Sequence, residues 1–235
     1  MIRGFYASRS GIIGQQQNMN VIANNFANIS TNGYKAQEAA FSTLIYAKVQ
    51  GGAGTTVSTG HGARVQSTAV DYSQGGLQET GVPTDMAILG EGFFAVTTGD
   101  GEDVYYTRNG EFKYSVDGDA KFLVDSAGAY VLDPDGSPVE LEGGEEITPG
   151  RIGVYKFPNR HGLELLGYNR LAATEVSGEA ELVEEAVIRQ GSLERSGVTA
   201  SEEIVRMIEA SRAFGFNTRV LQTIDEMEGV ANQLR

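Results

Sequence analysis

The 235-residue sequence contains no cysteine, which excludes a disulfide framework, a thiol nucleophile and a cysteine-ligated metal site. Proline is scarce at 5 residues whereas glycine is abundant at 31, a balance that favours strand-to-strand turns over disordered linkers. Basic residues are also few, because 18 Lys and Arg stand against 31 Asp and Glu to give a net charge of −13. So acidic a chain is not expected to bind nucleic acid or anionic membrane surfaces.

Long hydrophobic runs are absent as well. No stretch approaches the ~20 apolar residues of a membrane span, so membrane insertion is not expected. The N-terminal Met1-Ile2-Arg3 leads into a mixed stretch interrupted at residues 8–11, and a cleavable signal peptide is therefore not expected either. With 40% apolar residues, the chain is long enough for one large or two small domains with a sizeable core.

No catalytic constellation is present in the sequence. His61 and His161 each stand beside glycine in expected loops, and no second ligand follows at metal-binding spacing, so no metal or cofactor is expected. Glu145-Glu146 and Glu184-Glu185 are candidates for a glycosidase pair, although adjacent acids on loops are more typical of a solvated surface. Asp133-Pro134-Asp135-Gly136 resembles the start of a calcium loop, but the missing downstream ligands favour a β-turn. The sequence predicts a protein that is not an enzyme.

A long helix without any acidic residue is predicted from Ile2 to Ile29. Its apolar stripe repeats every seven residues and consists of Phe5, Ile12, Met19 and Phe26, joined by Ile22 and Ile29. Gln and Asn cover the remaining surface, where a solvated helix carries Lys and Glu. Amides lose less than charges when water is removed, so this helix is expected to be buried against other chains. Asn32-Gly33 supplies a helix stop, since Gly adopts the left-handed conformation that ends helices.

A second helix is predicted near the C-terminus. Ser201-Glu202-Glu203 suits its first turn, because acids are favourable at the positive end of the helix dipole. Its apolar stripe consists of Ile204, Met207, Ile208, Phe214, Leu221, Ile224, Met227, Ala231 and Leu234. Small residues between Ala210 and Gly215 would let another helix approach closely. A lone helix is marginal in water, so the two terminal helices are expected to pair.

Between the helices, short β-type segments alternate with Gly, Asp and Asn turns, which predicts an all-β domain. The predicted strands lie within 63–72, 85–89, 93–96, 104–107, 112–116, 121–124, 130–132, 139–141, 151–157, 163–168 and 186–189. Arg108-Asn109-Gly110 is a hairpin signal. Periodicity does not decide whether residues 34–50 form a helix or a strand. Gly51–Thr56 has the composition of a flexible connector. The β domain is either a sandwich or an open rolled sheet.

The fold class predicted is therefore α+β, mainly β, with an all-β central domain inserted between long terminal helices that pair. The expected domains are an N-terminal helix over 1–35, a connector over 36–62, the all-β domain over 63–197 and a C-terminal helix over 198–235.

Three segments resemble the axial proteins of the bacterial flagellum, which are the rod, hook and hook-associated proteins. The residues that carry this resemblance begin with 25–35, continue through 73–112 and end in 196–203 and 224–234. The signature residues are Asn25, Ala27, Asn28, Ser30, Thr31, Gly33, Tyr34, Gly75, Leu77, Asp85, Ala87, Ile88, Gly90, Gly92, Phe93, Phe94, Thr107, Arg108, Gly110 and Phe112. Phe26 departs from the family, which more often has an aliphatic residue there. The sequence is thus similar to the flagellar basal-body rod protein family, of the FlgF/FlgG type.

The resemblance implies a structural subunit that polymerises helically into the rod, the shaft that transmits motor torque to the hook. It implies export without signal cleavage through the flagellar type III apparatus, a basal-body location, and further copies and other rod or hook subunits as partners. The implied assembly interface consists of Phe5, Ile12, Met19, Ile22, Asn25, Phe26, Asn28, Ile29, Ile204, Met207, Ile208, Phe214, Leu221, Ile224 and Leu234. The alternatives are a hook-type paralogue, a flagellum-associated cell-wall hydrolase and an export chaperone.

The branch within the family stays open at this point. Residues 228–229 and 231–233 resemble the proximal-rod branch, whereas Met1-Ile2-Arg3-Gly4 resembles the distal one. The stretch from Tyr46 to Gln74 looks shorter than in distal-rod members.

Overall fold

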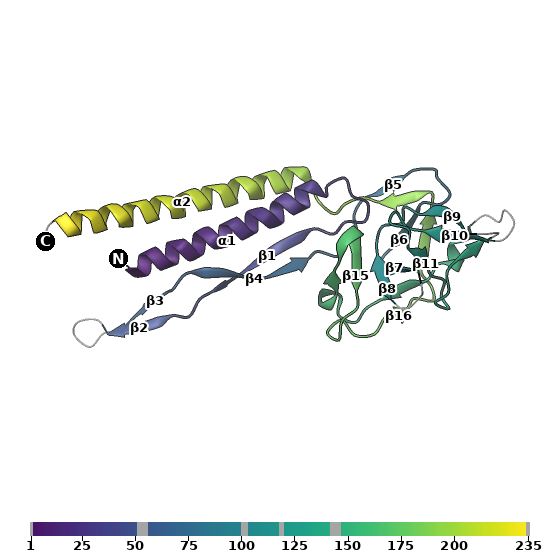
Figure 1. Ribbon diagram of the computed structural model, residues 1–235, viewed down its shortest axis with the longest axis horizontal. Helices are drawn as coiled ribbons and strands as arrows, with labels where there is room; N and C mark the ends of the chain where they lie inside the picture. Colours follow the sequence, from purple (N-terminus) through teal and green to yellow (C-terminus); the bar gives the residue numbers. More distant parts are fainter. Residues whose placement is uncertain (1, 51–55, 100–102, 118–119, 142–146, 234–235) are drawn as a thin grey trace. The chain divides into compact units, whose positions relative to one another are not determined.

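The computed structural model describes residues 2–50, 56–99, 103–117, 120–141 and 147–233. The chain folds into two compact units (Figure 1). The helical unit comprises Met1–Ala27, Gln37–Asp71 and Thr199–Arg235, and the β unit comprises Asn28–Ala36 and Tyr72–Val198. Helices that flank a central antiparallel β region confirm the predicted fold class.

The helical unit is built on α1 (Ile2–Ala27) and α2 (Ala200–Gln233), which run antiparallel along one another (Figure 1). Two glycines of α1 set their close approach. A Cβ on Gly4 would lie 3.1 Å from Cδ1 of Ile224, and one on Gly11 would lie 2.8 Å from the Asn217 amide. The predicted pairing is confirmed, and α1 ends two residues earlier than predicted.

The seam of this pair is displaced by one position from the predicted apolar stripe. Gly4, Gly11 and Asn25, spaced by multiples of seven, meet α2, whereas Phe5 and Phe26 are exposed. Small residues of α1 thus allow the approach, and Ala210, the first of the small residues predicted in α2, is buried as well. Gly215 of α2, predicted to serve this purpose, faces open space within the chain.

Four strands complete the helical unit. β1 (Gln37–Thr43) pairs antiparallel with β4 (Ala63–Val70), and β2 (Ala47–Gln50) pairs antiparallel with β3 (Thr56–Thr59). Residues 37–43 and 47–50 are thus extended, which decides the open choice between helix and strand, while 51–55 lie outside the described residues.

The strand expected to begin the all-β domain, β4, belongs instead to the helical unit because its partner is β1. Both strands of this pair fit closely against α1 near the end formed by Thr43 and Ala63. A Cβ on Gly14 of α1 would lie 3.2 Å from the Phe41 ring of β1, and one on Gly62, before β4, would overlap the Ser10 hydroxyl.

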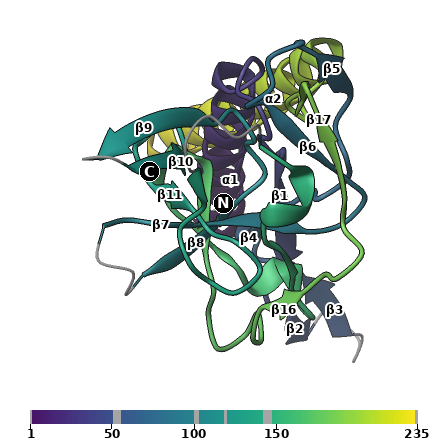
Figure 2. The ribbon, with the colours of Figure 1, turned by 90° about the vertical axis from the view of Figure 1, so that its right-hand side faces the viewer.

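The β unit contains a ten-stranded antiparallel sheet whose main path runs β12-β10-β11-β7-β8-β15-β14. Figure 2 labels the strands from β7 to β11 in this sheet. Its strands are β7 (Phe93–Thr97), β8 (Val104–Thr107), β9 (Lys113–Asp117), β10 (Ala120–Val124), β11 (Tyr130–Val131), β12 (Glu140–Leu141), β13 (Val154–Lys156), β14 (Glu164–Leu165), β15 (Arg170–Ala172) and β16 (Glu181–Leu182). Two further pairs join β5 (Leu77–Glu79) to β18 (Ser192–Glu194) and β6 (Met86–Leu89) to β17 (Val187–Gln190). Short 3₁₀ turns cover Pro149–Arg151, Arg160–Gly162 and Gly167–Asn169.

The central strand β7 is buried on both faces, so its side chains alternate between two apolar clusters. Phe94 lies in one cluster, with its ring centroid 5.1 Å from that of Phe112. Phe93 lies in the other, 6.2 Å from Phe157. The continuous apolar run that marked this strand in the sequence reflects that double burial.

The hairpin predicted at Arg108-Asn109-Gly110 is wrong. β8 pairs with β7 and β15, whereas β9 pairs with β10, so this segment connects two strands that are not partners. Gly110 serves a different purpose, since its carbonyl accepts a 3.0 Å hydrogen bond from the Met86 amide and a Cβ there would overlap the Met86 carbonyl oxygen.

The β-turn predicted at Asp133–Gly136 is confirmed. The Gly136 amide donates to the Asp133 carbonyl at 3.1 Å, and Oδ1 of Asp133 accepts from the amides of Asp135 and Ser137. The carboxylate is thus used by the turn itself.

Candidate functional site: helix surface and buried charge cluster

Two signature residues of the β unit, Gly75 and Arg108, contact the side chain of Glu194, which is almost wholly buried. Its Oε1 accepts hydrogen bonds from Nζ of Lys35 at 2.6 Å and from the Gly75 amide at 2.8 Å. Its Oε2 forms an ion pair of 3.3 Å with Nη1 of Arg108. One carboxylate therefore faces two buried cations that come from distant parts of the sequence.

Both cations are held by backbone carbonyls as well. Nζ of Lys35 donates to the Ser73 carbonyl at 2.7 Å. Arg108 donates to the carbonyls of Ile88 and Gly90, which lie at the end of β6 and just after it. Burial lowers the pKa of the Arg108 guanidinium, and the nearby Glu194 carboxylate opposes that change. With its carbonyl and carboxylate partners, this charge cluster satisfies most of its buried polar groups.

Backbone contacts join the same three segments. The Gly33 amide donates to the Glu194 carbonyl at 2.7 Å, and the Gly197 amide donates to the Tyr34 carbonyl at 2.9 Å. Gly33 has a left-handed φ of 68°, and a Cβ there would lie 2.5 Å from the Arg108 carbonyl carbon. Gly33 is therefore a close-packing position six residues beyond α1, and the prediction that it stops the helix is wrong.

The sequence offered no signal for this cluster. Lys35 is the last residue of the signature segment 25–35 but is not itself a signature residue, and Glu194 belongs to no recognisable motif. The two residues are 159 positions apart, and the backbone hydrogen bonds of Gly33 with Glu194 and of Gly197 with Tyr34 bring them together.

In the helical unit, the signature residue Asn25 is completely buried. Its Nδ2 donates to the Gln37 carbonyl at 2.7 Å, and its Oδ1 accepts from the Gln37 amide at 2.9 Å. The side-chain amide thus pairs with the start of β1 as a strand backbone would. Nδ2 also donates to Oε1 of Glu203 at 3.2 Å, which fixes the end of α1 to the first turn of α2.

Glu203, which was predicted only to stabilise the first turn of α2, also connects α2 with its neighbours. It is buried, and its Oε1 also receives Nη1 of Arg206 at 3.4 Å. Arg206 in turn reaches Oε1 of Glu38 on β1 at 2.6 Å. A polar chain from Asn25 to Glu38 therefore links α1, α2 and β1.

Asn25→Asp is expected to destabilise the helical unit by about 2–4 kcal/mol, because it removes two donated hydrogen bonds and places a second carboxylate beside Glu203. Like-charge proximity raises the pKa of the new Asp in the folded state, so the penalty should shrink as pH falls towards about 4. Thermal unfolding between pH 4 and 8 measures this. Asn20→Asp, on the exposed side of α1, is the matched control. Equal melting temperatures for the two variants at pH 7 would contradict the assigned role.

The predicted assembly residues fall into three groups. Phe5, Phe26, Ile204, Met207 and Ile208 are exposed. Ile12, Met19, Asn28, Ile29, Phe214, Leu221 and Ile224 are half-buried. Ile22 and Asn25 are buried inside the subunit, and Leu234 lies outside the described residues.

Sequence reasoning omitted several exposed apolar side chains of the same helices. They are Tyr6, Ile13, Val205, Phe216, Val220 and Val230, and Met227 of the predicted stripe is also exposed. So much apolar surface along two paired helices is typical of a protein–protein interface. The six omitted residues lie outside the predicted apolar stripes, which is why the stripes alone did not reveal them.

The candidate chemical groups do not assemble. Within the described ranges there is no cluster of three or more His, Asp or Glu side chains able to hold a metal ion. Nδ1 of His61 lies 2.8 Å from the Ile45 carbonyl, and Glu184 and Glu185 are exposed neighbours. Glu145 and Glu146 lie outside the described residues. Neither described helix has a long enough apolar stretch to cross a bilayer.

Three family models match successive parts of this arrangement. Residues 5–35 match the model described as flagella basal body rod protein, and 87–154 match the flagellar hook protein FlgE/F/G D1 domain. Residues 189–234 match the flagellar basal body rod FlgEFG protein C-terminal model. Paired terminal helices around an inserted β unit, matched in all three parts, define an axial protein of the rod and hook class.

Individual relatives show which family within the rod and hook class the chain belongs to. The chain is 35% identical to the flagellar basal-body rod protein FlgG of Buchnera aphidicola subsp. Schizaphis graminum, covering 100% of both chains. It is also 35% identical to FlgG of Borreliella burgdorferi, over 100% of this chain and 99% of that one. The flagellar hook protein FlgE of Helicobacter mustelae is 37% identical over 48% of this chain and 27% of its own length. The chain belongs to the flagellar basal-body rod protein family.

Proposed function

We propose that this chain is a structural subunit of the flagellar rod, and that it polymerises helically through its terminal helices into a torque-bearing shaft. The observation that carries the proposal is the apolar surface of α1 and α2, left uncovered by the subunit itself. An isolated subunit exposes this surface to water, and burying it against neighbouring copies provides the driving force for assembly. Rod relatives that match over the full length of the chain support the same function.

The partners follow from this role. Other rod and hook subunits extend the same shaft above and below this one, and the amide-rich, acid-free α1 provides a surface that loses little on desolvation. We further propose that the chain reaches the basal body unfolded, through the flagellar type III export apparatus, and acts there without catalysis. No observation on the described residues favours the hydrolase or chaperone alternatives.

Phe216→Lys is expected to raise the critical concentration for polymerisation roughly thirtyfold, the equivalent of about 2 kcal/mol per contact, because it places a charge in the buried interface. Sedimentation and electron microscopy of the purified full-length chain measure this. Val176→Lys in the β unit is the matched control, since the two side chains are 65% and 70% exposed. A wild-type chain that stays monomeric at high concentration would contradict the rod function. Polymerisation of Phe216→Lys at the wild-type concentration would instead remove this part of α2 from the interface.

A further inference from the structure

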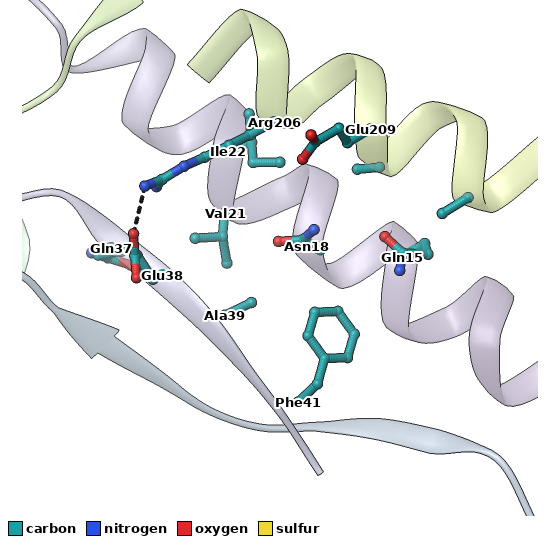
Figure 3. Close-up of a pocket in the computed structure, with 12 residues that line it drawn as sticks. Gln15, Asn18, Val21, Ile22, Gln37, Glu38, Ala39, Phe41, Arg206 and Glu209 are labelled. Atoms are coloured by element: carbon teal, nitrogen blue, oxygen red, sulfur yellow. Dashed lines mark ion pairs between the residues drawn. The ribbon is translucent and has the colours of Figure 1, made fainter. Parts of the chain in front are cut away.

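A groove of about 390 Å³ lies in the helical unit between α1, α2 and β1 (Figure 3). Val21 of α1 and Ala39 and Phe41 of β1 supply apolar surface, and Gln15 and Asn18 of α1 supply amides. The α2 wall includes Arg206, Glu209 and Ala213. The groove is therefore shaped for apolar side chains with a polar rim.

The charge of this groove is negative. Its one cation, Arg206, is already engaged by Glu38 at 2.6 Å (Figure 3). Glu203 also lies 3.4 Å from Arg206. Glu209 also lines the groove and forms no ion pair with any described residue. An occupant that combines apolar side chains with a positive charge would complement these features.

The outward side of α1 has this composition. Tyr6, Arg9 and Ile13 are all exposed, and their spacing of three and four residues places them on one face. Arg9 forms no ion pair with any described residue, and the helix contains no acidic side chain to repel the groove. At 3.6 residues per turn, this face is turned away from Gly4 and Gly11, which meet α2, and from Asn18, which lines the groove.

We propose that the groove of one subunit receives the Tyr6–Arg9–Ile13 face of a second copy, with Arg9 placed beside Glu209. This inference rests on the proposed rod function and names the contact that propagates it. Because the face and the groove lie on different sides of α1, the contact is heterologous. A heterologous contact that does not close into a ring repeats as an open helical filament.

A competing face exists on α2, where Arg212 stands between the exposed Ile208 and Phe216. Glu209 is one turn before Arg212 on the same helix. Docking this face would carry an acid into an acidic groove, so the charges favour α1 as the occupant.

The test uses two full-length single variants, Arg9→Glu and Glu209→Arg. Each variant gives the Tyr6–Arg9–Ile13 face and the groove charges of the same sign. Each is expected to raise the critical concentration for polymerisation at least about tenfold, because like charges repel across the contact. An equimolar mixture is expected to polymerise near the wild-type concentration, because every face then meets a groove of opposite charge in an alternating filament. The double variant Arg9→Glu/Glu209→Arg is expected to polymerise alone. Circular dichroism checks that each variant is folded.

Arg212→Glu is the matched control, and it is expected neither to block assembly by itself nor to rescue Glu209→Arg on mixing. Folded single variants that polymerise like wild type, or a mixture that gains nothing, would overturn the docking contact while leaving the rod function intact. Rescue of Glu209→Arg by Arg212→Glu would assign the groove to α2 instead. A wild-type chain that never polymerises would overturn the rod function and, with it, this contact.

Discussion

Glu194→Gln is expected to lower the free energy of unfolding of the β unit by about 3–5 kcal/mol, because it leaves two cations buried without a counter-charge. The substitution keeps the size of the side chain, so packing is not the cause. Lys35 and Arg108 each keep their carbonyl partners but lose the carboxylate that neutralises them. Urea unfolding of the full-length chain, followed by tyrosine fluorescence, measures the change.

The matched control is Glu79→Gln. Glu79 also forms an ion pair, 3.0 Å from Arg189, but both side chains are exposed, so solvent screens the interaction. Its loss is expected to cost no more than about 1 kcal/mol. A Glu194 variant whose free energy of unfolding lies within about 1 kcal/mol of this control would mean that the cluster does not hold the β unit together.

The three charged residues of the cluster come from segments that are far apart in the sequence. Lys35 precedes β1, Arg108 follows β8 and Glu194 ends β18, so the full set of ion pairs forms only when three remote segments have met. A buried charge without its partner is strongly unfavourable, so the loss of any one of the three segments exposes the others to this penalty.

Secondary structure that depends on neighbouring residues was predicted well from the sequence. The two helices, their pairing and most sheet strands follow from apolar periodicity and turn residues, which act within a few positions. Short strands such as β15 and β18 were missed because two or three residues carry no measurable alternation. The hairpin at 108–110 failed for a different reason, since a turn signal does not name the partner of the strand that follows.

Long-range packing was predicted less well. The seven-residue period in α1 is present, but a stripe of large apolar residues does not reveal that Gly4 and Gly11, one position away, form the seam. The buried positions of Asn25 and Glu194 likewise depend on partners far away in sequence. Signature residues identified the family correctly, yet their structural roles became clear only from their contacts.

The length of a relative can be compared with the shortened segment that the sequence suggested between Tyr46 and Gln74. The alignment with FlgG of Buchnera aphidicola subsp. Schizaphis graminum spans 261 positions, although this chain has 235 residues. That relative therefore carries residues that this chain lacks. This agrees with a shortened segment somewhere in the chain, which the sequence suggested for Tyr46 to Gln74.

Gly110→Ala is expected to destabilise the β unit by about 3 kcal/mol or more, because the added methyl group overlaps backbone atoms rather than a movable side chain. Gly110 and Met86 lie side by side, joined by the 3.0 Å hydrogen bond from the Met86 amide. A methyl group would force the Met86 carbonyl away and would also lie 3.2 Å from the Phe94 ring in the core. Strain at this point should reach Arg108, two residues earlier, and through it the charge cluster.

Gly76→Ala is the control for this variant. Gly76 lies in the same unit, its φ is not left-handed, and a Cβ there would meet no atom within 4 Å. It is expected to change stability by less than about 1 kcal/mol, with the lost freedom of the unfolded chain acting in its favour. Equal unfolding midpoints for the two alanine variants in urea would show that the backbone contact between Gly110 and Met86 is not required. A large loss confined to Gly110→Ala would explain chemically why glycine occupies this signature position.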